Sequence, residues 1–129
     1  MPPKLKIEVI HAASHPDKLN EEWIELHNEG DAPFNGEGCS ITVARGNGRP
    51  RVVTTMKAGL IIKPQERVRI VTGSSGKKTH GEAPGGDVRN FHLFLKAPYV
   101  ESSDVTVRVV NRQLEICKAS SATEAASAG

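Results

Sequence analysis

Long apolar runs are missing from this sequence of 129 residues. The N-terminal segment contains no apolar stretch of the length that a secretory signal needs, and no later segment approaches the roughly 18 apolar residues of a membrane-spanning helix. We therefore expect a soluble, cytoplasmic protein that does not contact a membrane.

Cysteine is nearly absent, since Cys39 and Cys117 are the two examples in the chain. Two cysteines are too few for a framework of disulfides. In a reducing compartment, two distant cysteines are most simply free thiols in the core. The alternative is one disulfide, if the two positions meet across a β-sandwich.

An amphipathic helix of convincing length is also missing, and apolar residues instead alternate with polar ones at a period of two. Strands are predicted at residues 4–11, 21–27, 39–45, 51–56, 60–62, 68–70, 88–95, 105–110 and 114–118. About eight or nine short strands joined by turns predict an all-β sandwich. We expect one domain at residues 1–118, followed by a disordered tail at 119–129.

The segment "EEWIELHNEGDAP" at residues 21–33 shows the alternation most clearly. Ile24 and Leu26 share one face of the predicted strand, and Glu25 and His27 share the other. Trp23 falls on the outer, charged face or at its rim. The pattern predicts a strand with Ile24 and Leu26 in the core.

Turn signals predict two hairpins in the middle of the chain. Asn47-Gly48 lies between the strands predicted at 39–45 and 51–56, and Asn-Gly is the strongest short hairpin signal. Pro64 occupies the second position of a turn at residues 63–66, between the strands predicted at 60–62 and 68–70. We expect a second hairpin there.

These segments, in this order, resemble the lamin tail domain family. The resemblance covers roughly residues 4–118: the strand and Gly-Asp turn within 21–33, the apolar strand and "KPQE" turn within 60–66, the polar loop at 73–87, and the closing strand pair. Two departures are that Gln65 stands where the family turn usually has glycine, and that Cys39 falls near where the family often has an aromatic residue.

The family resemblance implies an immunoglobulin-like β-sandwich that acts as an interaction module. Lamin tails bind proteins and nucleic acid, and bacterial relatives occur as accessory domains. This chain has neither a heptad rod nor a prenylation motif, which excludes a filament lamin. It is most similar to a stand-alone member of the bacterial type.

Motifs for catalysis, cofactors or metals are not evident. Glu21 and Glu22 are adjacent, so on a strand they point to opposite faces and cannot act as an acid and base pair; we expect both to be solvated. The histidines match no zinc-binding spacing, and the loop at 73–78 does not meet the spacing of a phosphate-binding loop. We expect no catalytic residues, no cofactor, no metal site and no enzymatic activity.

Charge is unevenly distributed along the chain. Residues 1–38 carry three basic and eight acidic side chains, a net of −5, whereas residues 39–118 carry fourteen basic and six acidic side chains, a net of +8. A charged, solubilising surface is the simpler interpretation of this asymmetry, and phosphate contacts by the basic residues are the alternative. The candidate nucleic-acid contacts are Arg45, Arg49, Arg51, Lys77 and Lys78.

A protein partner is the leading functional expectation, with nucleic-acid binding as the alternative. The sequence has five aromatic residues, three Phe, one Trp and one Tyr, and therefore offers no evident platform for stacking bases. Edge strands of a sandwich can accept an added strand, and Trp23 is the candidate protein contact, with Phe34 or Tyr99 beside it. The partner and the oligomeric state are not specified by the sequence.

Overall fold

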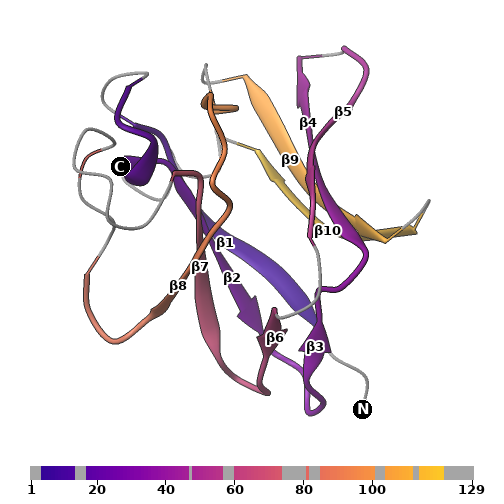
Figure 1. Cartoon of the computed structure of the whole chain (residues 1–129). Helices are drawn as coiled ribbons and strands as arrows, with labels where there is room; N and C mark the ends of the chain where they lie inside the picture. Colours follow the sequence, from indigo (N-terminus) through magenta and orange to yellow (C-terminus); the bar gives the residue numbers. More distant parts are fainter. Residues whose placement is uncertain are drawn as a thin grey trace.

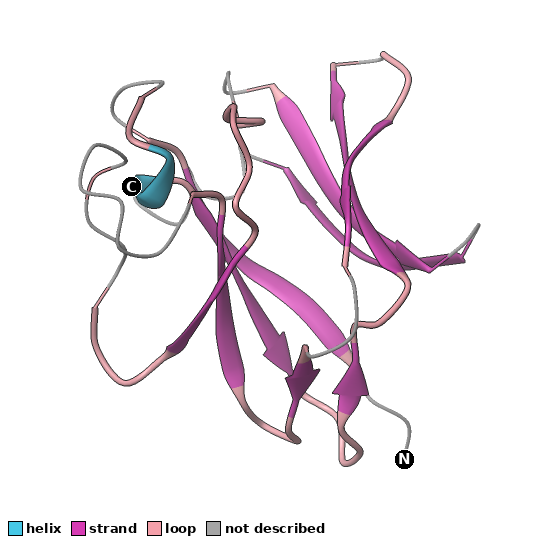
Figure 2. Ribbon diagram, in the orientation of Figure 1, coloured by secondary structure: helices cyan, strands magenta, loops and turns pink. Residues whose placement is uncertain are grey.

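The computed structural model describes residues 4–13, 17–46, 48–56, 60–73, 81, 85–100, 104–111 and 114–120. These residues form ten strands and one short 3-10 helix (Figures 1 and 2). In chain order they are β1 (Leu5–His11), η1 (Leu19–Glu21), β2 (Trp23–Asn28), β3 (Phe34–Asn35), β4 (Cys39–Arg45), β5 (Arg51–Thr55), β6 (Ile61–Ile62), β7 (Arg67–Val71), β8 (Arg89–His92), β9 (Val105–Asn111) and β10 (Leu114–Ser120). The prediction of an all-β protein is confirmed.

Two four-stranded sheets enclose one core. The first sheet has the order β1-β2-β7-β8 and the second has the order β10-β9-β4-β5, while β3 and β6 form a separate pair (Figure 1). Buried aliphatic side chains from both sheets belong to a single cluster, including Ile7, Ile24, Leu26, Ile41, Val43, Ile70, Val107 and Val109. The molecule is therefore a β-sandwich. Among the described residues, no helix is long and apolar enough to cross a membrane.

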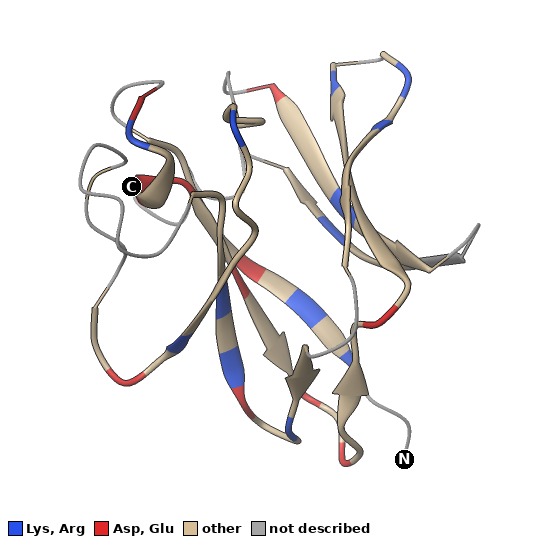
Figure 3. Cartoon of the chain, viewed as in Figure 1, with Lys and Arg blue, Asp and Glu red and all other residues tan. Residues whose placement is uncertain are grey.

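Strand β2 lies between β1 and β7, and its alternation matches the prediction. Ile24 and Leu26 are both 0% exposed and point into the core. Basic and acidic residues occur along β1, β2 and β7 (Figure 3), because the residues between the core positions face outward. Burying a large aliphatic side chain contributes about 1.5–3 kcal/mol, so β2 alone supplies a substantial part of the core.

The hairpin predicted at β4 and β5 is confirmed, and the one predicted around residues 63–66 is wrong. β4 pairs antiparallel with β5. In contrast, β6 pairs with β3, and β7 pairs with β2 and β8. The turn at 63–66 is therefore a corner that carries the chain from one sheet to another. Local turn chemistry predicted the turn, but the pairing partners come from distant segments.

Two further boundaries differ from the sequence predictions. β8 is shorter than the strand predicted at 88–95, and it runs parallel to β7, a pairing that periodicity cannot reveal. β10 continues through Ser120 because Ala119 and Ser120 pair with Val107 and Thr106 on β9. The predicted tail therefore begins too early, and residues 121–129 lie outside the described part of the chain.

The two cysteines are free thiols, which confirms the simpler of the two expectations. Cys39 lies on β4 and Cys117 on β10, with β9 between them in the same sheet. Strands two places apart are separated by about 9–10 Å, which exceeds the Cα separation of a disulfide. The alternative of a disulfide across the sandwich is therefore wrong. Burial raises the pKa of the Cys39 thiol and keeps it in the neutral, unreactive form.

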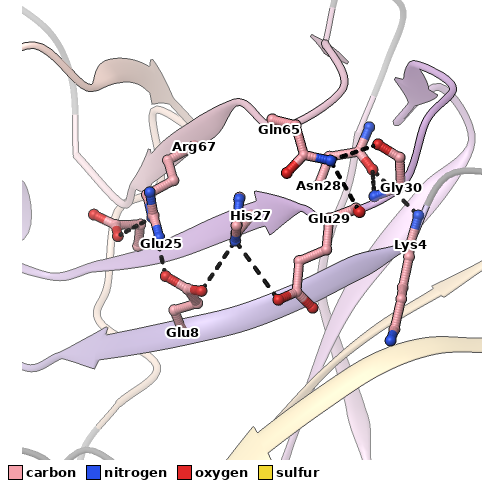
Figure 4. A network of polar contacts seen from close by, with 9 residues as sticks. All are labelled: Lys4, Glu8, Glu25, His27, Asn28, Glu29, Gly30, Gln65 and Arg67. Carbon is pink, nitrogen blue, oxygen red and sulfur yellow. Dashed lines mark hydrogen bonds and ion pairs between the residues drawn. The ribbon is translucent and has the colours of Figure 1, made fainter.

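Asn28 ends β2, and its side chain binds four backbone groups, two of which, on Lys4 and Gly30, are drawn in Figure 4. Its side-chain oxygen accepts hydrogen bonds from the N–H of Lys4 (3.2 Å) and Gly30 (3.0 Å). Its side-chain nitrogen donates to the carbonyls of Ala32 (2.8 Å) and Ile62 (3.0 Å). Because Asn28 is 0% exposed, these four groups depend on it in place of water.

Gln65 takes a left-handed backbone conformation, which usually favours glycine. Its φ is 68°, and the N–H of Glu66 donates to the carbonyl of Lys63 at 3.0 Å. With Pro64 before it, this geometry fits a turn that favours glycine at its third position. The Gln65 side chain compensates for the strain, since Nε2 donates to the carbonyls of Glu29 and Gly30, both at 3.0 Å (Figure 4).

Replacing Gln65 separates backbone strain from side-chain bonding. Gln65→Ala keeps the strained φ and loses both side-chain hydrogen bonds, so we expect it to lower the free energy of unfolding by about 1–2 kcal/mol. Gln65→Gly loses the same bonds but relieves the strain, and should be about 1 kcal/mol more stable than the alanine variant. Urea denaturation of both variants measures the difference; equal stability would show that the backbone is unstrained.

Candidate functional site

Three of the five predicted basic contacts come together at one cleft. Arg45, Arg49 and Arg51 line a concavity of about 240 Å³ at the β4–β5 hairpin, where basic residues gather in Figure 3. The remaining described lining residues are Val43, Gly48, Tyr99 and Val105. Lys77 and Lys78 lie outside the described residues, so their predicted place beside this hairpin stays untested.

The strand alternation explains why arginines border an otherwise apolar cleft. Val43 and Arg45 lie on the same face of β4, and Arg51 on β5 pairs with Val43. Val43 belongs to the buried core, whereas Arg45 and Arg51 are exposed. The arginines therefore continue the core-facing side of the sheet past the point where the core ends. They form a charged rim above buried Val43, Val105 and Tyr99.

Backbone contacts fix the loop that carries Arg49. The N–H of Gly48 donates to the carbonyl of Arg45, and the N–H of Gly46 donates to the carbonyl of Asp104, both at 2.8 Å. Gly46 has a φ of 54°, and a side chain there would begin 2.9 Å from a carboxylate oxygen of Asp104. The positive φ favours glycine at this position, whereas the Asp104 carboxylate, at the end of its side chain, could move to make space.

Two of the arginines at the rim, Arg49 and Arg51, are available to an anion. Arg49 and Arg51 are exposed, and within the described part of the chain no carboxylate pairs with either of them. Tyr99 contributes no titratable acid or base, because burial and then the negative charge of Glu22 raise the pKa of its hydroxyl. The cleft can therefore bind an anion through fixed positive charge, but its described lining offers no proton donor or acceptor that titrates near neutral pH.

A buried carboxylate supports the segment that contains Tyr99. Glu22 is 0% exposed. It accepts hydrogen bonds from the hydroxyl of Thr72 (2.7 Å) and from the backbone N–H groups of Tyr99 (3.1 and 3.2 Å) and Val100 (3.0 Å). The expectation that Glu22 is solvated is wrong. The alternation indicated that Glu22 is buried, because residues 22, 24 and 26 share the core-facing side of the strand, but this signal was missed.

The outer face of the first sheet carries a network of charges that neutralise one another (Figure 4). Glu8 on β1 contacts His27 on β2 and Arg67 on β7, each at 3.0 Å. Arg67 also lies 3.7 Å from Glu25. Burial opposes ionisation of Glu8, but hydrogen bonds from Arg67 and His27 outweigh it and lower the pKa of that carboxyl. The acidic and histidine residues of β2 therefore serve cross-strand pairing.

The geometry of this network also bears on metal binding. Ligand atoms of Glu8, His27 and Glu29 lie within 4.8 Å of one another, close enough to hold a cation. His27 is 4.0 Å from the Glu29 carboxylate (Figure 4). However, Glu8 is already bound by Arg67, whose positive charge disfavours a second cation. Hydrogen bonding accounts for the arrangement without a metal.

Trp23 lies on the outer face, as the alternation predicted, and is half-buried. Its ring stacks on His11 with centroids 4.9 Å apart and planes inclined by 6°, and the guanidinium of Arg69 lies 5.0 Å from its centroid. Contacts within the chain therefore occupy much of the indole. A role for Trp23 in binding a protein stays a prediction.

Comparison with models of known protein families and with curated proteins gives no match to this sequence.

Proposed function

We propose that this protein is a non-catalytic binding module that contacts nucleic-acid phosphates through the cleft lined by Arg45, Arg49 and Arg51, called the arginine cleft below. The observation that carries the proposal is the convergence of Arg45, Arg49 and Arg51 on one concave surface. Arginine is suited to phosphate because its planar guanidinium can donate two parallel hydrogen bonds. Such contacts supply affinity without reading sequence, which agrees with the small number of aromatic residues.

We also propose that the sandwich is immunoglobulin-like and related to the lamin tail domain. The orders β1-β2-β7 and β10-β9-β4-β5 correspond to the A-B-E and G-F-C-C′ orders of immunoglobulin sandwiches. Parallel β8 departs from that pattern, since a D strand would precede β7 in the chain. The positive φ of Gln65, where the family usually has glycine, supports the relationship.

Binding of a protein partner is the second candidate function, and the edge of the second sheet favours it. β5 is the outermost strand of the sheet order, and within the described residues no strand pairs with its outer edge. Val52 on this strand is 60% exposed. An extended peptide could add to such an edge through backbone hydrogen bonds, with an apolar side chain against Val52.

Binding to mixed-sequence duplex DNA tests the leading proposal. We expect binding at low salt that weakens steeply as salt is raised, because phosphate contacts release counterions. Arg49→Glu/Arg51→Glu should abolish it, since two attractive charges become repulsive at the rim of the cleft. Fluorescence anisotropy at several salt concentrations measures both effects.

A matched control is available at distant exposed positions. Lys6→Glu/Lys63→Glu changes the net charge by the same amount on β1 and in the 63–66 turn, away from the cleft. This variant should retain most of the binding. Equal loss in both double variants would indicate a diffuse charge effect, and no binding by the unmodified protein at low salt would direct attention to the β5 edge.

A further inference from the structure

The shape of the arginine cleft distinguishes among the parts of a nucleic acid that could enter it. The cleft is a concavity of about 240 Å³ with Val43, Val105 and Tyr99 beneath the charged rim. This volume is below the roughly 300–1,000 Å³ of pockets that enclose drug-sized ligands. The phosphates inside a duplex lie on a convex helical surface, so they would meet only the rim. A strand end has no chain beyond it and can enter.

The number of arginines favours a terminal phosphate over an internal one. A terminal phosphate carries about −1.5 to −2 charges near neutral pH and has three strong acceptor oxygens, as in phosphorylated side chains. An internal phosphodiester carries a single charge. Arg49 and Arg51 together carry two positive charges, which match the charge of a terminal phosphate better than that of a diester. Arg49 and Arg51 also have no carboxylate partner in the described chain.

The described lining residues include few groups that could recognise a base. Tyr99 is only 2% exposed, so its ring cannot stack on a base as an open platform. Val43 and Val105 are buried as well, so they offer little apolar surface to a base or a sugar. Recognition would therefore depend on the phosphate and on the shape of the strand end, independently of sequence.

We infer that the cleft binds the phosphorylated end of a nucleic-acid strand, with the terminal phosphate on Arg49 and Arg51. This inference rests on the proposed function and adds a preference for one chemical group. It follows that the protein should discriminate between strands that differ only in that group.

Two labelled single-stranded oligonucleotides of one sequence test the inference, one with a 5′-phosphate and one with a 5′-hydroxyl, with the dye at the 3′ end. We expect the phosphorylated strand to bind about tenfold more tightly, since charged hydrogen bonds of this kind are worth at least about one order of magnitude in affinity. Arg49→Ala/Arg51→Ala should remove the preference. Lys6→Ala/Lys63→Ala should keep it, and circular dichroism checks that both variants fold.

The remaining outcomes separate failure of the inference from failure of the proposed function. Equal, salt-dependent binding of the two strands would overturn the inference and leave the proposed function standing. Absence of binding to either strand at low salt would overturn both. Tighter binding of a phosphoserine peptide of equal charge would also overturn the inference, because the cleft would then select phosphate on a peptide.

Discussion

Asn28→Ala is expected to lower the free energy of unfolding by about 3–4 kcal/mol, a large effect for a single substitution. The alanine would leave two backbone N–H groups and two backbone carbonyls without their partner. Asn28 is fully buried, so water cannot easily replace the lost bonds. Urea denaturation monitored by circular dichroism measures the change. A typical domain has a free energy of unfolding of about 5–15 kcal/mol, so a domain at the lower end of this range would lose most of its stability.

Asn28→Asp tests whether the hydrogen bonds or the size of the side chain matter. Aspartate keeps the shape and the acceptor oxygen, but it cannot donate to the carbonyls of Ala32 and Ile62. It should therefore be at least as destabilising as alanine. Asn35→Ala is the matched control, because Asn35 is exposed and accepts one hydrogen bond from the N–H of Glu37. A loss for Asn28→Ala no greater than that of the control would contradict this account.

Glu22→Ala is expected to lower the free energy of unfolding by about 2–4 kcal/mol, because three buried donors lose a charged acceptor. The loss of local stability should be greatest in the segment beneath the cleft that contains Tyr99 and Val100. Hydrogen exchange at the backbone N–H groups of Tyr99 and Val100 should accelerate more than exchange in β9, which has its own ladder to β4.

Glu22→Gln gives the sharper comparison, since it preserves the volume of the side chain. The amide retains one acceptor oxygen and places a donor group where the carboxylate accepted hydrogen bonds. We expect Glu22→Gln to lower the free energy of unfolding, but by less than Glu22→Ala does. Glu37→Gln, at an exposed position, should leave stability nearly unchanged. Stability of Glu22→Gln equal to that of the unmodified protein would mean that the negative charge contributes nothing to the fold.

Periodicity and turn residues predicted the local structure, because both depend on neighbouring residues. The alternation around Ile24 and Leu26 placed β2 correctly, and Asn47-Gly48 placed the β4–β5 hairpin. The same alternation placed Glu22 on the core side, but the general rule that carboxylates are solvated led to the wrong environment. A buried carboxylate is tolerated only when donors surround it, and those of Tyr99 and Val100 lie 77 and 78 residues away.

The sequence did not predict which distant segments pair with one another. The turn around Gln65 was predicted, whereas its use as a corner depends on β6 pairing with β3 and on β7 pairing with β2. The parallel contact between β7 and β8 likewise has no local signal. The arginine cleft was predicted in part: Arg45, Arg49 and Arg51 were chosen from their spacing, but the contribution of Tyr99 appears only in three dimensions.

The acidic and histidine residues around β2 are explained by pairing within the sheet. Glu8, His27 and Arg67 join β1, β2 and β7 through contacts of 3.0 Å, so their charges are largely satisfied. The arginines at the hairpin differ, because Arg49 and Arg51 have no such partner in the described chain. This contrast between the paired network on the first sheet and the exposed pair Arg49 and Arg51 directs the functional proposal to the hairpin.

The salt dependence of duplex DNA binding tests the central claim most directly. Each phosphate contact contributes about 0.9 to the slope of log affinity against log salt concentration. Arg49→Ala/Arg51→Ala should therefore reduce the magnitude of the slope by about two, whereas Lys6→Ala/Lys63→Ala should leave it nearly unchanged. A slope that is the same in the unmodified protein and in the arginine variant would show that these arginines do not contact phosphate.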